Sequence, residues 1–252
     1  MNDLQRQLAE IRKKTKRYPG NQDYLSRRQE FAKSIGYPDL FRFIDQFGLY
    51  AGTQTLATRL MAYEVVKQSV SVPGHIMEFG VWDGSNLMFM AKLLELLQPA
   101  TCKQVFGFDN FAGLPAPHAL DGVDAKSMVG HYKGNEEVLR KAIDLYDMDD
   151  FVQLVVGDAL ETIPAFEKEF PEAMVSLAWI DFDLYEPCKV ALDFLAQRLS
   201  VGGIIVFDEA ISSAWPGETV AMREFLESSG GKYRMEANVL GRQPSLYLVR
   251  ES

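Results

Sequence analysis

The sequence has few of the features that mark secreted or membrane-spanning proteins. It contains two cysteines, Cys102 and Cys188, which are too few for a disulfide framework, and we expect both to be buried free thiols. No run of apolar residues approaches the ~18 needed for a transmembrane helix. The N-terminal stretch MNDLQRQLAEIRKKTKRYPG is charged and has no apolar segment of the signal-peptide kind. The sequence therefore predicts a cytoplasmic protein without a membrane partner.

Positive charge is also in short supply. Lys and Arg number 26 against 35 Asp and Glu, which gives a formal net charge of −9. Because a nucleic-acid-binding surface needs basic residues to neutralise phosphates, we expect no nucleic-acid partner. Histidine is rare and scattered. His75 is interpreted as structural, and His118 and His131 as surface residues of a polar loop, 112–134, with closure over a substrate as the alternative.

Apolar residues, in contrast, make up 47% of the chain, enough to bury a substantial core. After Gly74, near-continuous apolar stretches alternate with helical patterns, which is typical of an α/β fold whose parallel sheet is covered on both faces. Segments 232–240 and 245–250 are expected to close the sheet as an antiparallel pair. The predicted strands are 75–80, 105–109, 151–156, 174–181 and 203–208, and the predicted helices are 85–97, 135–147, 159–170, 187–199 and 218–228.

The first quarter of the chain has helical patterns but no core of its own. Helices are predicted at 2–17, 22–35, 38–48 and from Thr55 to about Val72. We therefore divide the chain into an N-terminal helical extension, 1–54, and a main domain, 55–252. The aromatic residues of the extension lack an obvious core, so we expect them to contact a second subunit in a homodimer or larger oligomer. These residues are Phe41, Phe43, Phe47 and Tyr50.

Acidic residues stand at or just after the predicted strand ends. One such residue is ordinary, because Asp is a good cap for a helix N-terminus. Several at the carboxyl edge of an open parallel sheet, where ligands bind, favour a functional site. They are Glu78, Asp109, Asp158, Asp181 and Asp208. Asp183 follows Asp181 by two residues, and we expect the chain to turn there so that the two carboxylates take different roles.

The turn after the first predicted strand is rich in glycine. Gly80 and Gly84 allow the backbone to approach a ligand before the next helix begins, but their spacing is not that of the GxGxxG dinucleotide fingerprint. Asp109 ends the second strand, where an acid commonly accepts hydrogen bonds from ribose hydroxyls. Together these features suggest a ligand that contains adenosine, and S-adenosylmethionine fits an acidic rim better than NAD does.

Five stretches carry a resemblance to a known family. VPGHIMEFGVWDGSN, FDNFAGLP, VVGDALETIP, WIDFDLYEPCKVAL and GGIIVFDEA resemble the macrocin O-methyltransferase family, from about Thr53 to Phe225. The resemblance implies a Rossmann-like class I methyltransferase sheet, mostly parallel with an antiparallel C-terminal strand. It also implies an S-adenosylmethionine-dependent enzyme that methylates a sugar hydroxyl, on a natural product or related glycoside, with Mg²⁺.

The resemblance further assigns roles to the strand-end residues. Glu78, Gly80 and Ser85 would hold the methionine end of the cofactor. Asp109 would bind the ribose with Phe111 beside it, and Asp158 would reach the adenine. Asp181 would contact the cofactor and would also bind the metal, together with Asp208 and Glu209. Asp183 would be the general base. The chain departs from the family in two places, with Glu209 where a second aspartate is usual and Asp83-Gly84-Ser85 where an Arg-Gly-Gly-like segment is common.

Mg²⁺ chemistry agrees with this assignment. A sugar hydroxyl is a poor nucleophile near pH 7, and neighbouring hydroxyls chelated by Mg²⁺ become more acidic. Carboxylates suit this hard ion. Three other functions compete: a catechol or other vicinal-diol O-methyltransferase, a nucleotide-linked oxidoreductase, and a non-catalytic partner protein with the same fold. The missing GxGxxG argues against the oxidoreductase. A non-catalytic protein would have no use for the acidic residues at the strand ends. Trp82, Trp215 and Tyr185 are interpreted as packing residues or as contacts to the sugar.

Overall fold

The computed structural model describes residues 22–241 and 243–252, so the helix predicted at 2–17 lies outside the described residues. The chain divides into two compact units. In the described part, the first contains residues 22–52 together with 137–149, and the second contains the remainder. No pattern in the sequence indicated that 137–149 belongs with the N-terminal segment.

The first unit consists of short helices joined by ion pairs and aromatic contacts. The guanidinium of Arg28 donates to Asp45 at 2.6 Å and lies 4.0 Å from the centroid of the Phe41 ring. Arg27 donates to Asp147 at 2.8 Å, which ties the two segments of the unit together. The helix predicted at 22–35 is confirmed, whereas the one predicted at 38–48 is two short helices. The helices are α2 (Gln22–Ser34), α3 (Leu40–Ile44), α4 (Phe47–Tyr50) and α7 (Glu136–Leu145).

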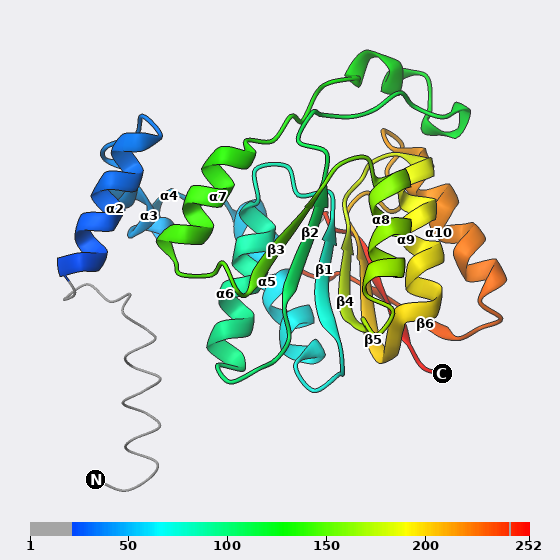
Figure 1. The fold of residues 1–252 in the computed structure, drawn as a ribbon. Helices are drawn as coiled ribbons and strands as arrows, with labels where there is room; N and C mark the ends of the chain where they lie inside the picture. Colours follow the sequence, from blue (N-terminus) through cyan, green and yellow to red (C-terminus); the bar gives the residue numbers. More distant parts are fainter. Residues whose placement is uncertain (1–21, 242) are drawn as a thin grey trace, which may run out of the picture. The chain divides into compact units, whose positions relative to one another are not determined.

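The second unit is built on a seven-stranded sheet in the order β3-β2-β1-β4-β5-β7-β6 (Figure 1). The first five strands in this order are parallel, and β7 pairs antiparallel with both β5 and β6. The predicted α/β class and the closing antiparallel pair are therefore confirmed. The strands are β1 (His75–Phe79), β2 (Val105–Asp109), β3 (Val152–Val156), β4 (Val175–Ile180), β5 (Leu199–Phe207), β6 (Tyr233–Ala237) and β7 (Leu246–Arg250).

Helices cover both faces of this sheet. In Figure 1, α5 and α6 lie on one face and α8, α9 and α10 on the other. Because α9 begins two residues earlier than predicted, Pro187 falls in its first turn, where a missing backbone N–H costs nothing. The helices are α5 (Thr53–Ser69), α6 (Ser85–Leu97), α8 (Ala159–Glu169), α9 (Tyr185–Arg198) and α10 (Pro216–Ser228). Among the described residues, no helix has both the length and the apolar character needed to cross a membrane.

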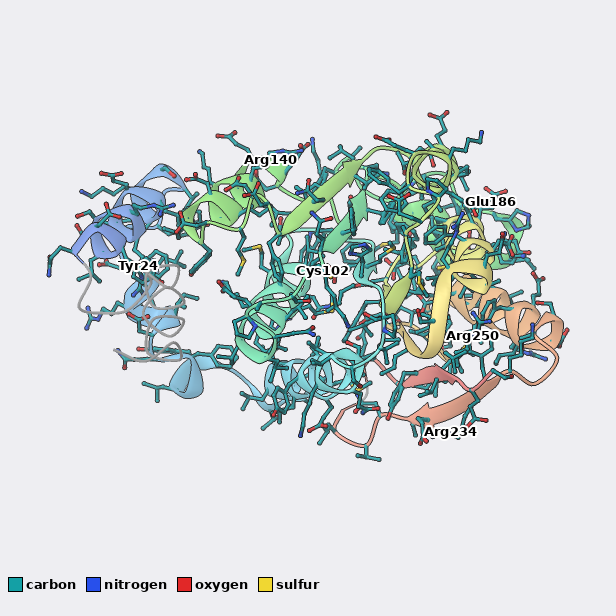
Figure 2. All side chains as sticks on the ribbon, turned by 60° about the horizontal axis from the view of Figure 1, so that its bottom comes forward. Tyr24, Cys102, Arg140, Glu186, Arg234 and Arg250 are labelled. Atoms are coloured by element: carbon teal, nitrogen blue, oxygen red, sulfur yellow. The ribbon has the colours of Figure 1, made fainter. Side chains whose placement is uncertain are left out.

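The two cysteines differ in their surroundings. Both are free thiols, as expected, and Cys188 is buried within α9. The prediction that Cys102 is buried was wrong, because this residue is exposed in the loop between α6 and β2 (Figure 2). The apolar strand that follows begins only at Val105, so Cys102 precedes the part of the chain that enters the core.

The sheet's register brings several strand ends level with one another. Phe79 of β1 lies opposite Phe108 of β2 and Ile180 of β4, and Ile180 lies opposite Phe207 of β5. These residues are fully buried, and the rings of Phe79 and Phe108 stack with centroids 4.9 Å apart. Burial of each such side chain contributes about 1.5–3 kcal/mol. The residues that follow them therefore emerge together at one edge of a rigid core.

The edge of the sheet formed by β6 carries charged side chains. At the antiparallel end, Arg234 and Arg250 extend from neighbouring strands (Figure 2). Arg234 donates to Glu251 at 2.9 Å, and charged side chains on an edge strand discourage pairing with other chains.

Above the carboxyl ends of the parallel strands lies the segment between β2 and α7, which contains two short 3₁₀ helices, η1 (Ala119–Asp121) and η2 (Asp124–Met128) (Figure 1).

Candidate active site

A cavity of about 440 Å³ opens at the carboxyl edge of the parallel strands. Seven of the residues singled out from the sequence line it, namely Gly80, Asp109, Asp158, Asp181, Asp183, Asp208 and Glu209. The sheet register explains this, because the five parallel strands β1 to β5 all end at about the same level. Glu78, Ser85 and Phe111, which were also singled out, are not part of the cavity lining.

Gly80 permits the closest backbone approach in this region. Its φ angle is +95°, a conformation that L side chains rarely adopt. A Cβ atom there would lie 1.9 Å from the carbonyl oxygen of Asp181. The backbone N–H of Asp181 in turn donates to the carbonyl of Phe79 at 2.7 Å. The turn after β1 and the end of β4 are therefore in direct backbone contact, which only glycine allows.

Glu78 belongs to a polar cluster beneath the first turn of α6. It is 1% exposed, and burial raises its pKa to about 8. Its Oε1 accepts a hydrogen bond from Asn86 at 2.8 Å, while its Oε2 is buried with no hydrogen-bond partner. Arg59 of α5 donates to Ser85 Oγ at 2.8 Å and to Asn86 Oδ1 at 3.1 Å. The structure thus brings Glu78 and Ser85 together and adds Arg59 and Asn86, which the sequence analysis missed.

Asp109 connects the turns that follow β1 and β2. One carboxylate oxygen accepts hydrogen bonds from the backbone N–H groups of Val81 and Trp82, at 2.7 and 2.8 Å. The other accepts from the N–H of Phe111 at 2.6 Å. An ionised carboxylate has about four acceptor positions, so room remains for one more donor. Binding of ribose hydroxyls by Asp109 stays a prediction.

Asp158 has the ordinary capping role that acids at strand ends often take. Its Oδ1 accepts a hydrogen bond from the N–H of Leu160 at 2.9 Å, so it caps the N-terminus of α8. Asp158 is also part of the cavity lining. The cap positions the carboxylate there, and contact with an adenine ring is a further role that stays a prediction.

The remaining acids crowd one another. Burial raises the pKa of Asp183 to about 8, and the charges of Glu209 and Asp208 add to the effect. Burial also raises the pKa of Asp208, to about 6. The pKa of Asp181 is raised well above its usual range by burial and then by Asp208 and Asp183. Like charges in a desolvated space oppose ionisation, and clusters of this kind are frequent in functional sites.

The backbone around these acids is strained. β4 ends at Ile180 and the chain turns, as expected, so that Asp183 has a φ of +63°. Non-glycine residues with positive φ are uncommon and gather at functional sites when the surrounding structure holds them. Others next to the cavity or on the turns around it are Trp82, Phe111, Tyr132 and Ile211.

The chemistry of the donor set suits a hard divalent cation. The side-chain nitrogen Nε2 of Gln243 donates to Asp208 and to Glu209, both at 2.6 Å. One carboxylate oxygen from each acid therefore lies against the same nitrogen atom. Oxygen ligands are those that Mg²⁺ prefers, and a cation would offset the mutual repulsion of the acids. Among the described residues, no group of three His, Cys, Asp or Glu side chains is already arranged around a metal position.

Glu218, in the first turn of α10, was missed by the sequence analysis. It is completely buried, and burial raises its pKa well above the usual range. Its Oε1 accepts a hydrogen bond from the backbone N–H of Glu209 at 2.8 Å, which fixes the turn after β5. An acid in the first turn of a helix is so common on protein surfaces that its position gives no sign of this contact.

Aromatic side chains form one wall of the cavity. The ring of Tyr132 makes edge contacts with Trp82 and Trp215, with centroids 6.1 and 6.3 Å away. All three line the cavity, as does His118, whose ring lies 5.1 Å from that of Tyr185. Burial raises the pKa of Tyr132, and the nearby Asp183 raises it further. The surface beside the acids is thus suited to the apolar face of a ring.

The sheet order, with its antiparallel strand β7 and its ligand cavity at the carboxyl ends of the parallel strands, defines a class I methyltransferase fold. The chain belongs to the Macrocin-O-methyltransferase (TylF) family, whose profile matches residues 50–236. The resemblance seen in the sequence is therefore confirmed.

Three relatives illustrate the likeness. The chain is 31% identical over 144 residues to 8-demethyl-8-(2,3-dimethoxy-alpha-L-rhamnosyl)-tetracenomycin-C 4'-O-methyltransferase of Streptomyces olivaceus, covering 55% of this chain and 53% of that one. It is 28% identical over 145 residues to demethyldecarbamoylnovobiocin O-methyltransferase of Streptomyces niveus, again covering 55% and 53%. The chain spans about half the length of these curated relatives.

The third relative, the calicheamicin methyltransferase CalS11, is known from solved structures. One matches with a TM-score of 0.74 at 28% identity, covering 92% of this chain and 93% of that chain. An apo structure of CalS11, described as a TDP-rhamnose 3'-O-methyltransferase, matches with a TM-score of 0.67 at 28% identity and covers 92% and 95%.

Proposed function

We propose that this protein is an S-adenosylmethionine-dependent and Mg²⁺-dependent O-methyltransferase that acts on a sugar hydroxyl of a natural-product glycoside. The observation that carries the proposal is the placement of Asp183 beside Asp208 and Glu209 in one cavity, next to the glycine turn after β1. The names of the relatives support a sugar acceptor, since two of them describe methylation of a rhamnose unit.

The cofactor would bind along the turns that follow β1, β2 and β3. S-adenosylmethionine supplies a methyl group on a sulfonium and carries an ammonium and a carboxylate at its methionine end. The unpartnered Oε2 of Glu78 would accept from the ammonium, with Gly80 and Ser85 alongside. Asp109 would accept from the ribose hydroxyls, beside Phe111, and Asp158 would lie at the adenine.

The metal would be held by Asp181, Asp208 and Glu209. When bound, Mg²⁺ supplies a positive charge that makes a neighbouring hydroxyl more acidic. For the ion to bind, the Gln243 amide would have to release the carboxylates of Asp208 and Glu209, to which it now donates hydrogen bonds. Glu218 would keep the backbone of Glu209 in place during that change, through its hydrogen bond to the Glu209 N–H.

Asp183 would act as the general base. Burial and the charges of Glu209 and Asp208 raise its pKa to about 8 in the metal-free protein, and a cation held by those acids would lower it toward neutral pH, where a base can accept a proton and later release it. S-adenosylmethionine would supply the methyl group, and Asp183 would accept the proton of the acceptor hydroxyl as that oxygen is methylated. The aromatic wall formed by Trp82, Tyr132 and Trp215 would hold the ring of the acceptor.

A methyl-transfer screen tests this function. Purified protein is incubated with S-adenosylmethionine and a panel of rhamnosides, other glycosides and catechols, with Mg²⁺ or with a chelator. We expect transfer to a glycoside hydroxyl that stops with the chelator and returns with Mg²⁺. Transfer to catechols alone would favour the vicinal-diol alternative. Turnover that persists with the chelator would contradict the metal assignment, and calorimetry that detects NAD but no S-adenosylmethionine would contradict the whole proposal.

A further inference from the structure

A buried aspartate joins the segment above the cavity, residues 112–134, to the turn that carries Asp183. Asp121, the last residue of η1, is 1% exposed and lines the cavity. Its Oδ1 accepts a hydrogen bond from the backbone N–H of Tyr185, and its Oδ2 accepts from the N–H of His118, both at 2.6 Å. Tyr185 is the first residue of α9, where backbone N–H groups have no partner within the helix. The carboxylate therefore fixes a backbone position two residues after Asp183.

The first turn of α10 is shaped to accept this carboxylate. A Cβ atom at Gly217 would lie 1.8 Å from Asp121 Oδ1 and 2.8 Å from the Tyr185 nitrogen. The space that a larger residue would fill is thus occupied by the Asp121 side chain. Gly217 has no positive φ that would require glycine, so the close approach of Asp121 explains the glycine at this position.

A small apolar cluster makes the same connection. Leu184, which lies between Asp183 and Tyr185, is 2% exposed and packs with Ala125 of η2 and with Trp215. Leu114 and Met128 pack against this cluster from the same segment. The segment above the cavity and the turn after β4 therefore share both a hydrogen-bonded contact and a core.

An ordinary capping role accounts for only half of this arrangement. Asp121 completes a capping box with His118 in η1, and that explains the bond from the His118 N–H. It does not explain the second bond, which joins residues 64 positions apart in the chain, or the burial of the side chain. Burial of a carboxylate is costly unless its oxygens are hydrogen-bonded. Both oxygens of Asp121 have a donor, so the surroundings fit this side chain in shape and in hydrogen bonding.

We propose that Asp121 is a positioning residue that holds Asp183 in the orientation needed for proton transfer. It also fixes segment 112–134, which lies above the cavity, where the sugar acceptor would bind. This inference rests on the proposed function of Asp183 as the base. Asp183 has a φ of +63°, which is uncommon for a residue other than glycine, so the contacts around it help to hold this conformation. Asp121 supplies one of these contacts through Tyr185, and it does so without touching the reacting atoms.

Hydrogen exchange at the Tyr185 amide tests the contact without any need for activity. We compare wild type with Asp121→Ala, Asp121→Asn and Gly217→Ala, and use Asp124→Ala as a control because Asp124 is exposed in the neighbouring η2. We expect faster exchange in Asp121→Ala and Gly217→Ala, intermediate exchange in Asp121→Asn, which keeps one acceptor oxygen, and wild-type exchange in Asp124→Ala. Unchanged exchange in all variants would overturn the proposal.

Kinetics with the acceptor found in the screen then test positioning. We expect kcat to fall by roughly 10- to 100-fold in Asp121→Ala and Gly217→Ala, the usual scale when a reacting group is misplaced by about 1 Å, with the Kd for S-adenosylmethionine unchanged. Recovery of part of the loss in Asp121→Asn would support the proposal. Faster exchange with wild-type kcat would overturn it. If wild type itself transfers no methyl group, the proposed function is wrong, and the exchange data still decide whether Asp121 holds the turn.

Discussion

Asp183 occupies a backbone conformation that few non-glycine residues adopt, and its carboxyl group has a pKa of about 8. Asp183→Asn keeps the shape of the side chain but removes its basicity. We expect kcat to fall by roughly 10²–10⁴, the scale of a general base, while binding of S-adenosylmethionine and Mg²⁺ is kept. Steady-state kinetics and calorimetry measure the two effects. Loss of Mg²⁺ binding with rescue by excess metal would make Asp183 a ligand instead.

Asp208→Asn provides the matched comparison for that experiment. A residue that holds the metal should lose Mg²⁺ affinity together with rate. The contrast between the two variants therefore separates proton transfer from metal binding, because both substitutions exchange one carboxylate for an amide in the same cavity.

Glu78 gives a prediction for pH. Its pKa is about 8 in the folded protein against an ordinary value of 4.5, so between these values the folded state binds more protons than the unfolded state. Its contribution to the free energy of unfolding is thus full below about pH 4.5 and is lost as pH rises toward 8. We expect Glu78→Gln, whose amide oxygen can still accept from Asn86, to flatten the fall in stability over this range.

Chemical denaturation at pH 5 and pH 8, without ligand, measures this effect. Asp181, Asp183 and Asp208 also have raised pKa values and contribute with the same sign, so the variant should reduce the pH dependence and not abolish it. A variant with the same pH dependence as wild type would contradict the raised pKa of Glu78.

Among the elements, the turn between β1 and α6 is the most sensitive to the size of a side chain. Gly80→Ala would place a Cβ atom 1.9 Å from the carbonyl oxygen of Asp181, at a φ of +95°. We expect a loss of stability of at least ~1–3 kcal/mol, the scale of strained backbone, together with weaker S-adenosylmethionine binding. Thermal denaturation and calorimetry report these changes. Gly48→Ala is the control, because outside the local helix backbone no atom lies within 4 Å of a Cβ there, and equal effects of the two would contradict the close approach.

Elements were predicted better than contacts between them. Alternating apolar strands and helices indicated the α/β fold, and residues after strand ends were expected to meet because parallel strands share a carboxyl edge. The pairings of Arg59 with Ser85 and of Asp121 with Tyr185 join residues 26 and 64 positions apart, and the pairing of Glu218 with Glu209 joins residues nine positions apart. Each depends on how a helix packs against its neighbours, which no local pattern encodes. The predicted start of α9 was two residues late. Proline is most common at the first helical position, so the helix was expected to begin at Pro187, whereas Pro187 is the third residue of α9.

For the whole molecule, the exposed aromatic side chains of the first unit bear on assembly. Phe43, Phe47 and Tyr50 are 49%, 42% and 56% exposed, and the rings of Phe43 and Tyr50 contact each other at 5.3 Å. We expect a homodimer or larger oligomer in which this patch is covered, because large exposed apolar patches often mark interaction sites. Light scattering should give at least twice the 28.4 kDa of one chain.

Replacement of Phe43 and Phe47 by serine should return the protein to a single chain, whereas Val239→Ser, at a site 90% exposed in the second unit, should leave assembly unchanged. A wild-type particle of 28.4 kDa would contradict the oligomer, and an oligomer that survives the double substitution would place the interface elsewhere.

The aligned ends of β1, β2, β4 and β5 also bear on how such an enzyme can diversify during evolution. An insertion of one residue within β4 would move Asp181 by about 3.3 Å and reverse the side of the sheet on which each later residue lies. The same insertion in the segment between Gly113 and Asp121 would leave every strand end where it is. Changes in length should therefore accumulate above the cavity and alter which acceptors are taken, while the lengths of the strands stay fixed.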